Sequence, residues 1–431
     1  MTYDSRPDTP ATESGKLRPL DKDILRRLAA ELAQIAALPI HKEKAALWQK
    51  LNDRESKRPM VWINEICWNE MNVNDELTLQ CESPWARAQE CELKKILYQW
   101  RHLPGDMIVD DFLASPLVIR NTGFGIVEDV DIVRTDASSS VVSRHFKIQI
   151  RDFKDLDKIR MPTVTHDAIA TETQYQAMCE VYKGIMPVKK TGQAHIWFTP
   201  WDYLIRWWGI EEAMIDMIER PALVHAGVER MVDVWMTMLD QFIKLNVLEL
   251  NNSNIRVGSG GYAYTKTLPG APYDAKRVQP HNLWGCSNAQ IFSEISPEMH
   301  WEFALQHDLR RLKRWGLNYY GCCEPLDKKI EILKRIPNLR KVSASPWCNA
   351  GKMISGLGGN YVLSHKPNPA ILAGDHWHPE RARQALRDFL DPTEGRCHVE
   401  LIMKDISTVR YEPQRLWEWE KIAMQEAERY A

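Results

Sequence analysis

Short apolar runs alternate with longer segments of helical periodicity along most of the chain. The short runs predict strands over residues 59–63, 107–109, 194–198, 247–250, 317–321, 339–343, 361–364 and 398–403. Between them, apolar residues recurring at helical spacing predict helices over 82–100, 171–182, 201–219, 221–245, 297–315, 327–335, 379–390 and 412–429. This alternation of strand and helix favours an α/β fold, and specifically a (β/α)8 TIM barrel.

Two regions depart from the alternation. Residues 117–150 contain β-branched or alternating runs separated by Gly, Asp and Ser, which predicts an antiparallel β insertion. Residues 258–283 form a long loop rich in Gly, Pro and aromatic residues, and a loop of that length is usually functional. Its Gly258-Ser-Gly-Gly261 stretch lacks the spacing of a dinucleotide fingerprint and the lysine of a P-loop, which argues against a nucleotide site.

The N-terminal region has a different character. Residues 1–16 are rich in Pro, Thr, Ser and Asp, so we expect disorder there, and they lack the apolar core of a secretory signal. From residue 21 to 52 the apolar residues recur at helical spacing, with a break at Pro39. We therefore expect a tail and helical extension over 1–57 and the barrel over 58–431.

Composition narrows the class of protein. A hydrophobic content of 44% and a charged content of 26% are typical of a soluble globular protein. The formal charge of -2 gives no electrostatic reason to expect nucleic acid or a membrane surface as partner, and no apolar run approaches the roughly 18 residues of a membrane span. Nine cysteines without framework spacing indicate reduced thiols and a cytoplasmic protein.

Residues 317–325 contain the most distinctive chemistry. A predicted strand ends there on Gly321, followed by Cys322, Cys323 and Glu324. In barrel enzymes the catalytic groups lie at this end of the strands, and thiolates and carboxylates both bind metals. The alternative is that the two cysteines are small buried residues beneath a turn, with one facing away from the other.

Further candidates follow the other predicted strands. Glu65, Glu70 and Asp405 are candidates either to donate a proton or to complete a metal shell, and Lys404 is either catalytic or the partner of Asp405 in an ordinary ion pair. His365 is a candidate metal ligand, a substrate contact or a loop histidine. The 17 tryptophans suggest an aromatic-lined pocket or ordinary packing, and Asn residues after a strand bind substrate or cap a turn. The predicted substrate contacts are Trp68, Asn251, Asn254, Tyr320 and Trp347.

Four motifs carry a resemblance to a known family. They are Gly321-Cys-Cys-Glu-Pro-Leu326, the stretch 336–347, His365-Lys-Pro-Asn-Pro369 and Ile402-Met-Lys-Asp405. From about Arg58 onward the chain resembles a bacterial branch of the uroporphyrinogen-decarboxylase-like superfamily. That superfamily contains decarboxylases and zinc-dependent, cobalamin-linked methyltransferases, both on TIM barrels. The decarboxylases have arginines after the first strand, whereas residues 62–70 here are acidic and contain none, which favours the methyltransferase branch.

The resemblance implies a ligand set and a reaction. Zinc in the methyltransferases is bound by a His-x-Cys pair and a distal Cys, a pattern that this chain does not match literally. The residues at the corresponding places are Cys322, Cys323 and Glu324, with His365 as a further ligand and Asp405 at the distal strand. Zinc would act as a Lewis acid.

The implied reaction transfers a methyl group from a small methylated substrate, such as a methoxyaromatic compound, to cobalamin on a partner corrinoid protein. The partner is needed because the chain lacks the corrinoid-binding Asp-x-His-x-x-Gly motif. Two alternatives stay open, a metal-independent decarboxylase or lyase and a non-catalytic barrel that binds an aromatic ligand. A homodimer is one assembly that the sequence leaves open.

Overall fold

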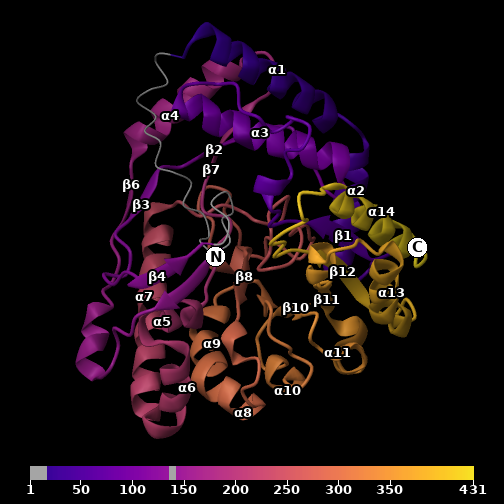
Figure 1. Ribbon diagram of the computed structural model, residues 1–431. Coiled ribbons are helices and arrows are strands. Elements are labelled where there is room, and N and C mark those ends of the chain that lie inside the picture. Colours follow the sequence, from indigo (N-terminus) through magenta and orange to yellow (C-terminus); the bar gives the residue numbers. More distant parts are fainter. Residues whose placement is uncertain (1–16, 135–141) are drawn as a thin grey trace.

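The computed structural model describes residues 17–134 and 142–431 (Figure 1). A six-stranded parallel sheet lies at its centre, in the order β1-β12-β11-β10-β9-β8. The strands are β1 (Met60–Ile63), β8 (Trp284–Ser287), β9 (Leu317–Tyr320), β10 (Leu339–Ala344), β11 (Val362–His365) and β12 (His398–Met403). The α/β class is confirmed, as are the strands predicted at 59–63, 317–321, 339–343, 361–364 and 398–403.

The other three predicted strands, at 107–109, 194–198 and 247–250, are not regular strands, and β8 was not predicted. Between two of these segments and β8, the side chain of Asn251 makes hydrogen bonds that the backbone would make in a regular parallel sheet. The Asn251 amide donates to the carbonyls of Ala194 (2.8 Å) and Trp284 (3.1 Å) and accepts from the Trp284 N–H at 2.9 Å. A single parallel bridge joins Gln193 to Leu248. β8 escaped prediction because its Trp-Gly-Cys-Ser sequence has no β-branched residue.

Helices follow most strands and cover one face of the sheet. Around the sheet lie α5 (Pro200–Trp208), α6 (Ile210–Glu219), α7 (Pro221–Leu245), α8 (Pro297–His300), α9 (Gln306–Leu312), α10 (Ile330–Leu333), α11 (Ala350–Leu357), α12 (Ala370–Ala373), α13 (Pro379–Leu390) and α14 (Gln414–Glu428). The helix predicted over 201–219 is divided at Gly209, whose φ of 87° no L-residue adopts easily. The helix predicted over 297–315 contains a π-helical turn at Trp301–Leu305.

The N-terminal helices are α1 (Pro19–Ala36), α2 (Ile40–Asn52), α3 (Pro84–His102) and α4 (Ala168–Tyr182). Figure 1 shows α1, α3 and α4 together on one side of the molecule, where Arg26 donates to the Val181 carbonyl at 2.6 Å. The disorder predicted for residues 1–16 lies outside the described residues. No helix in the described part of the chain combines the length and the apolar character that crossing a membrane requires.

The antiparallel insertion is present and extends further than predicted. The strands β4 (Val130–Val133) and β5 (Ser143–Phe146) pair antiparallel, as do β3 (Ile119–Asn121) and β6 (Val164–His166). A parallel pair, β2 (Leu113–Pro116) and β7 (Val188–Thr191), joins the two ends of this region. The insertion is therefore tied to the chain through residue 191, beyond the predicted limit of 150.

The sheet has two faces of opposite character. On the face that we call outer, Val342, Leu363 and Leu401 pack with Phe389 of α13 and Trp419 of α14 in an apolar core. The alternate positions of the strands point to the opposite face, which we call inner. Several of these positions are polar, so the inner face is partly polar.

An ion pair lies at the centre of the inner face. Lys341 and Glu400 are fully buried, with Lys341 Nζ 2.8 Å from Glu400 Oε2. The loop of residues 258–261 completes it, since the Gly261 N–H donates to Glu400 Oε1 at 3.1 Å. A Cβ on Gly260 would clash with the same carboxylate, and one on Gly261 would clash with Trp48 of α2, which explains the glycines of this loop.

Removing the cation of this ion pair should destabilise the protein strongly. We expect Lys341→Met to lower the free energy of unfolding by about 3–5 kcal/mol, because it leaves the Glu400 carboxylate buried without a partner. The double variant Lys341→Met/Glu400→Met should recover most of that loss. Urea denaturation measures both, with Lys334→Met, which breaks the exposed pair with Glu331, as the control. A loss in Lys341→Met no larger than in the control would contradict the prediction.

Candidate active site at the carboxyl edge of the sheet

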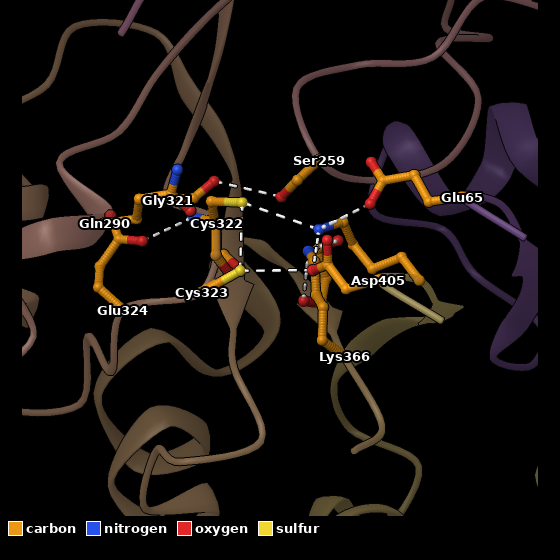
Figure 2. A network of polar contacts seen from close by, with 12 residues as sticks. Glu65, Ser259, Gln290, Gly321, Cys322, Cys323, Glu324, Lys366 and Asp405 are labelled. Carbon is orange, nitrogen blue, oxygen red and sulfur yellow. Dashed lines mark hydrogen bonds and ion pairs between the residues drawn. The ribbon is translucent and has the colours of Figure 1, made fainter. Parts of the chain in front are cut away.

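Polar side chains from three strand ends converge at the carboxyl edge of the sheet (Figure 2). Glu65 follows β1, Cys322 and Cys323 follow β9, and Lys404 and Asp405 follow β12. We call these five residues the Cys322 cluster. They converge because parallel strands end at the same edge, where barrel enzymes carry their catalytic groups.

The two cysteines of the cluster have pKa values that are shifted in opposite directions. Their sulfurs are 3.5 Å apart, and Cys323 Sγ is also 3.5 Å from Asp405 Oδ2. The hydrogen bond from Cys323, together with Lys404 Nζ at 3.9 Å, lowers the pKa of Cys322 against the effect of its burial. The same hydrogen bond and burial raise the pKa of Cys323. The geometry thus favours a thiolate at Cys322 and a thiol at Cys323.

A buried lysine lies between these sulfurs and two carboxylates. Lys404 contacts Asp405 and lies 3.2 Å from Glu65 Oε2. Burial disfavours its charge, but the anionic Cys322 and Glu65 hold the Lys404 pKa well above its ordinary value. Although burial would raise the pKa of Glu65, Arg256 at 2.8 Å and Lys404 hold it well below the usual range. Glu65 is therefore ionised.

Asp405 is the carboxyl group of the cluster that retains its proton most readily. Burial raises its pKa, Lys404 opposes that rise, and the neighbouring charge of Glu65 adds to it. Two carboxyl groups with pKa values shifted in opposite directions supply distinct acid and anion roles within one site. Asp405 is thus suited to donate a proton and Glu65 to remain an anion.

Lys366, which follows β11, was not among the predicted site residues. Its ammonium donates to Tyr319 Oη at 2.5 Å and Ser364 Oγ at 2.6 Å, and burial lowers its pKa to about 7. Tyr319 Oη lies 2.8 Å from Ser259 Oγ, so the 258–261 loop reaches this lysine as well. The strand alternation was the available signal: Ser364 and Lys366 share the inner face, whereas His365 between them faces outward.

The predicted metal-ligand set is not assembled. The Glu324 carboxylate accepts from the Cys322 N–H at 2.9 Å and the Ala289 N–H at 3.3 Å, on the other side of Cys322 from Asp405 (Figure 2). The His365 ring stacks on Phe389 with centroids 3.7 Å apart. Within residues 17–134 and 142–431, no group of three or more His, Cys, Asp or Glu is arranged to hold a metal. The donor set therefore does not fit zinc, since an ammonium lies among the thiols and carboxylates.

Glu70 and Tyr320 have structural contacts instead of the predicted functional ones. Glu70 Oε2 accepts from the Val409 N–H at 2.7 Å and from Thr408 Oγ1 at 2.9 Å, which anchors the turn after β12. Tyr320 is on the outer face, where its hydroxyl lies 2.6 Å from His300 Nε2. Neither side chain points into the Cys322 cluster.

The remaining predicted substrate contacts also lie elsewhere. Asn251 uses its amide in the hydrogen bonds described above, and the Asn254 amide donates to the Ile108 carbonyl and to Asp110, both at 3.1 Å. Trp68 packs edge-on against Tyr98, and Trp347 is 68% exposed. Two hollows, of about 310 and 400 Å³, lie between α12, α13 and α14 and around residues 408–415, and no residue of the Cys322 cluster lines either of them.

Comparison with known proteins does not identify a family for this chain. No protein-family model matches the chain, and no curated protein matches it. Among solved structures, a methyltransferase from Methanosarcina mazei aligns with 89% of this chain and 98% of its own, with a TM-score of 0.49 and 10% sequence identity. A likeness at that level does not support a functional argument, so the family resemblance rests on the sequence motifs alone.

The thiolate of Cys322 can be observed directly. We expect the ultraviolet absorbance of the wild type to show a thiolate at lower pH than the ordinary cysteine value of about 8.5, and this signal should be missing in Cys322→Ser. Lys404→Met should move it to higher pH because the nearby cation is lost. Cys348→Ser is the control, since burial raises the pKa of Cys348 to about 12. Identical titrations of wild type and Cys322→Ser would contradict the assignment.

The geometry also predicts the metal content. We expect anaerobically purified protein to carry far less than one zinc per chain, and Cys322→Ser and Glu324→Gln to leave the content unchanged. Elemental analysis provides the measurement. Stoichiometric zinc in the wild type that both variants lose would show that the donors rearrange around a metal.

Proposed function

We propose that this chain is a methyltransferase that removes a methyl group from a small methylated substrate, such as a methoxyaromatic compound. The acceptor implied by the sequence resemblance is the corrinoid of a partner protein, whose cobalt would take up the methyl group. The observation that carries the proposal is the Cys322 cluster, in which Asp405, a carboxyl group whose pKa is raised by burial, lies beside a buried ammonium at the carboxyl edge of the sheet. Strongly shifted pKa values in such a place are typical of catalysis.

The cluster has the groups that breaking a methyl–oxygen bond requires. When the methyl group leaves, the substrate oxygen gains an electron pair and needs a proton. Asp405 supplies that proton, and the Lys404 ammonium on the same carboxylate stabilises the charge that Asp405 then acquires. Glu65, which is itself paired with Arg256, holds Lys404 in place from the other side. No step is assigned to zinc, because the donor set does not fit it.

We further propose that the sheet closes into a barrel, as the sequence predicts. The three predicted strands that are not regular lie along the two edges of the sheet, beside β1 and β8. The Asp106 N–H donates to the Val61 carbonyl of β1 at 2.7 Å, and Asn251 joins residue 194 to Trp284 of β8. The Gln193 N–H donates to the Val247 carbonyl at 2.7 Å between them. These contacts support closure through the segments 106–109, 193–198 and 247–251, which with the six strands of the sheet make nine positions, one more than the predicted eight because β8 was not among them.

The two alternatives from the sequence have weaker support. A decarboxylase of acidic substrates needs cations free to bind carboxylates, whereas Arg256 and Lys404 both contact Glu65. A purely ligand-binding barrel would not need ionisable groups whose pKa values diverge so far within one cluster. We therefore favour methyl transfer.

Loss of the proton donor should abolish most of the activity. With a reduced corrinoid protein and methoxyaromatic donors, we expect the wild type to form methylated corrinoid, followed by its visible spectrum. Asp405→Asn should slow this by roughly 100-fold or more. The wild-type rate should fall as pH rises through the raised pKa of Asp405, since the acid form is then lost.

Asp111→Asn is the matched control, because Asp111 follows a neighbouring segment but is 83% exposed. Full demethylation without any corrinoid protein would contradict the proposed acceptor. An Asp405→Asn variant as fast as Asp111→Asn would contradict the proposed acid.

A further inference from the structure

The two adjacent thiols of the Cys322 cluster point toward one another. In a continuing strand, the side chains of successive residues would point to opposite faces. Gly321 ends that alternation with a φ of 99°, which L-residues rarely adopt, and a Cβ there would clash with Leu326. Beyond this glycine the chain turns, and Figure 2 shows the sulfurs of Cys322 and Cys323 side by side.

The surrounding loop holds Cys322 more firmly than Cys323. The Cys322 N–H donates to Glu324 at 2.9 Å, and the Cys322 carbonyl accepts from Ser343 Oγ at 2.6 Å. Cys322 is 3% exposed, whereas Cys323 is half-buried. The pair therefore consists of a fixed sulfur and a neighbouring sulfur at the border of the buried site, where a small reagent has access.

The neighbours of the two sulfurs give them different reactivity. Lys404 Nζ lies 3.9 Å from Cys322 Sγ, and Cys323 Sγ lies 3.5 Å from Asp405 Oδ2. A neighbouring ammonium favours the thiolate, which is the nucleophilic form of cysteine. A neighbouring carboxyl group offers no such stabilisation. Cys322 is therefore the nucleophile of the pair, and Cys323 is the thiol that can react with the product formed on Cys322.

We propose that Cys322 and Cys323 form a site of reversible oxidation by hydroperoxides. Their sulfurs are 3.5 Å apart, so a disulfide bond of about 2.05 Å requires an approach of roughly 1.5 Å. A thiolate beside a resolving thiol is the arrangement in which peroxide oxidation ends at a disulfide and stays reversible. This proposal goes beyond the proposed function and does not depend on it.

The oxidation by hydrogen peroxide has two steps. The Cys322 thiolate attacks one peroxide oxygen, the O–O bond breaks, and the other oxygen leaves as water with a proton that Asp405 is placed to supply. Cys322 is then a sulfenic acid. The Cys323 sulfur attacks the Cys322 sulfur, the S–O bond breaks, and the departing hydroxide leaves as water with the proton of Cys323. The two sulfurs are oxidised to one disulfide, and the peroxide is reduced to water.

Oxidation changes the cluster around the two sulfurs. It removes the anion that faces Lys404 and the S–H group that faces Asp405. The Cα atoms of adjacent residues are about 3.8 Å apart, closer than the roughly 4.4–6.8 Å that is usual for disulfides. A disulfide between adjacent cysteines is therefore strained and easily reduced by thiols.

Mass spectrometry of peroxide-treated protein tests the proposal. The tryptic peptide of residues 315–328 contains Cys322 and Cys323 and no other cysteine. After hydrogen peroxide, and alkylation in denaturant, we expect this peptide to have lost two hydrogens and to carry no alkyl group. The pair should react at least about tenfold faster than Cys348, which is also half-buried but whose pKa burial raises to about 12. Dithiothreitol should restore both thiols.

Two variants separate the roles of the cysteines. Cys323→Ser should gain oxygen on Cys322 and form no disulfide, because the resolving thiol is missing. Cys322→Ser should leave Cys323 available to the alkylating reagent. Cys348→Ser is the matched control and should form the disulfide as fast as the wild type. Thermal unfolding confirms that the variants are folded.

The wild type alone is enough to overturn the proposal. A pair that is still alkylated after Cys348 has been oxidised would do so. So would a peptide that gains oxygen atoms and is not restored by dithiothreitol, because Cys323 would then fail to resolve the oxidised Cys322. A disulfide between Cys322 and any other cysteine would contradict the assignment of its partner.

Discussion

Burial of lysine ammonium groups on the inner face of the sheet is the constraint on which the rest of the structure depends. Lys341, Lys366 and Lys404 project there from adjacent strands, out of contact with bulk water. A buried charge must be compensated by anions or dipoles in fixed positions. The glycine-rich loop must therefore approach closely enough for its backbone to reach Glu400, and the strand ends must supply carboxylates for Lys404.

The three lysines differ in what surrounds them, and so in what they can do. Lys341 is matched by a single carboxylate and is structural. Lys366 donates to hydroxyl groups and a carbonyl, and burial lowers its pKa to about 7, so it loses its proton more readily than the other two. Lys404 is held charged by several anions that also hold one another's pKa values apart. The same kind of side chain is therefore structural in the middle of the inner face, where Lys341 pairs with Glu400, and part of the candidate site at the carboxyl edge, where Lys404 contacts Glu65 and Asp405.

The sequence predicted where the site lies better than which side chains enter it. The rule that parallel strands share a carboxyl edge was enough to bring Glu65, Cys322 and Asp405 together. It could not tell inward from outward positions, because a shift of one residue exchanges the faces of a strand. His365 and Tyr320 were misplaced for that reason. Glu324 was misplaced because a carboxylate binds backbone amides as readily as a metal. No feature of the sequence indicates that the Asn251 amide would replace backbone hydrogen bonds between residue 194 and β8.

The position of Trp48 has a consequence for the order in which the protein is made. This tryptophan of α2 is fully buried against Tyr262, Val362 and Ile402, and Asn52 donates to the Tyr262 carbonyl at 2.8 Å. All of these partners are synthesised more than two hundred residues later. During translation, Met60, Ile108 and the Asp106 carbonyl are available to Trp48 early, but Val362 and Ile402 complete its surroundings only near the end of synthesis. The apolar side of α2 is therefore only partly covered for most of the synthesis of the chain, and its packing is completed by contacts distant in sequence.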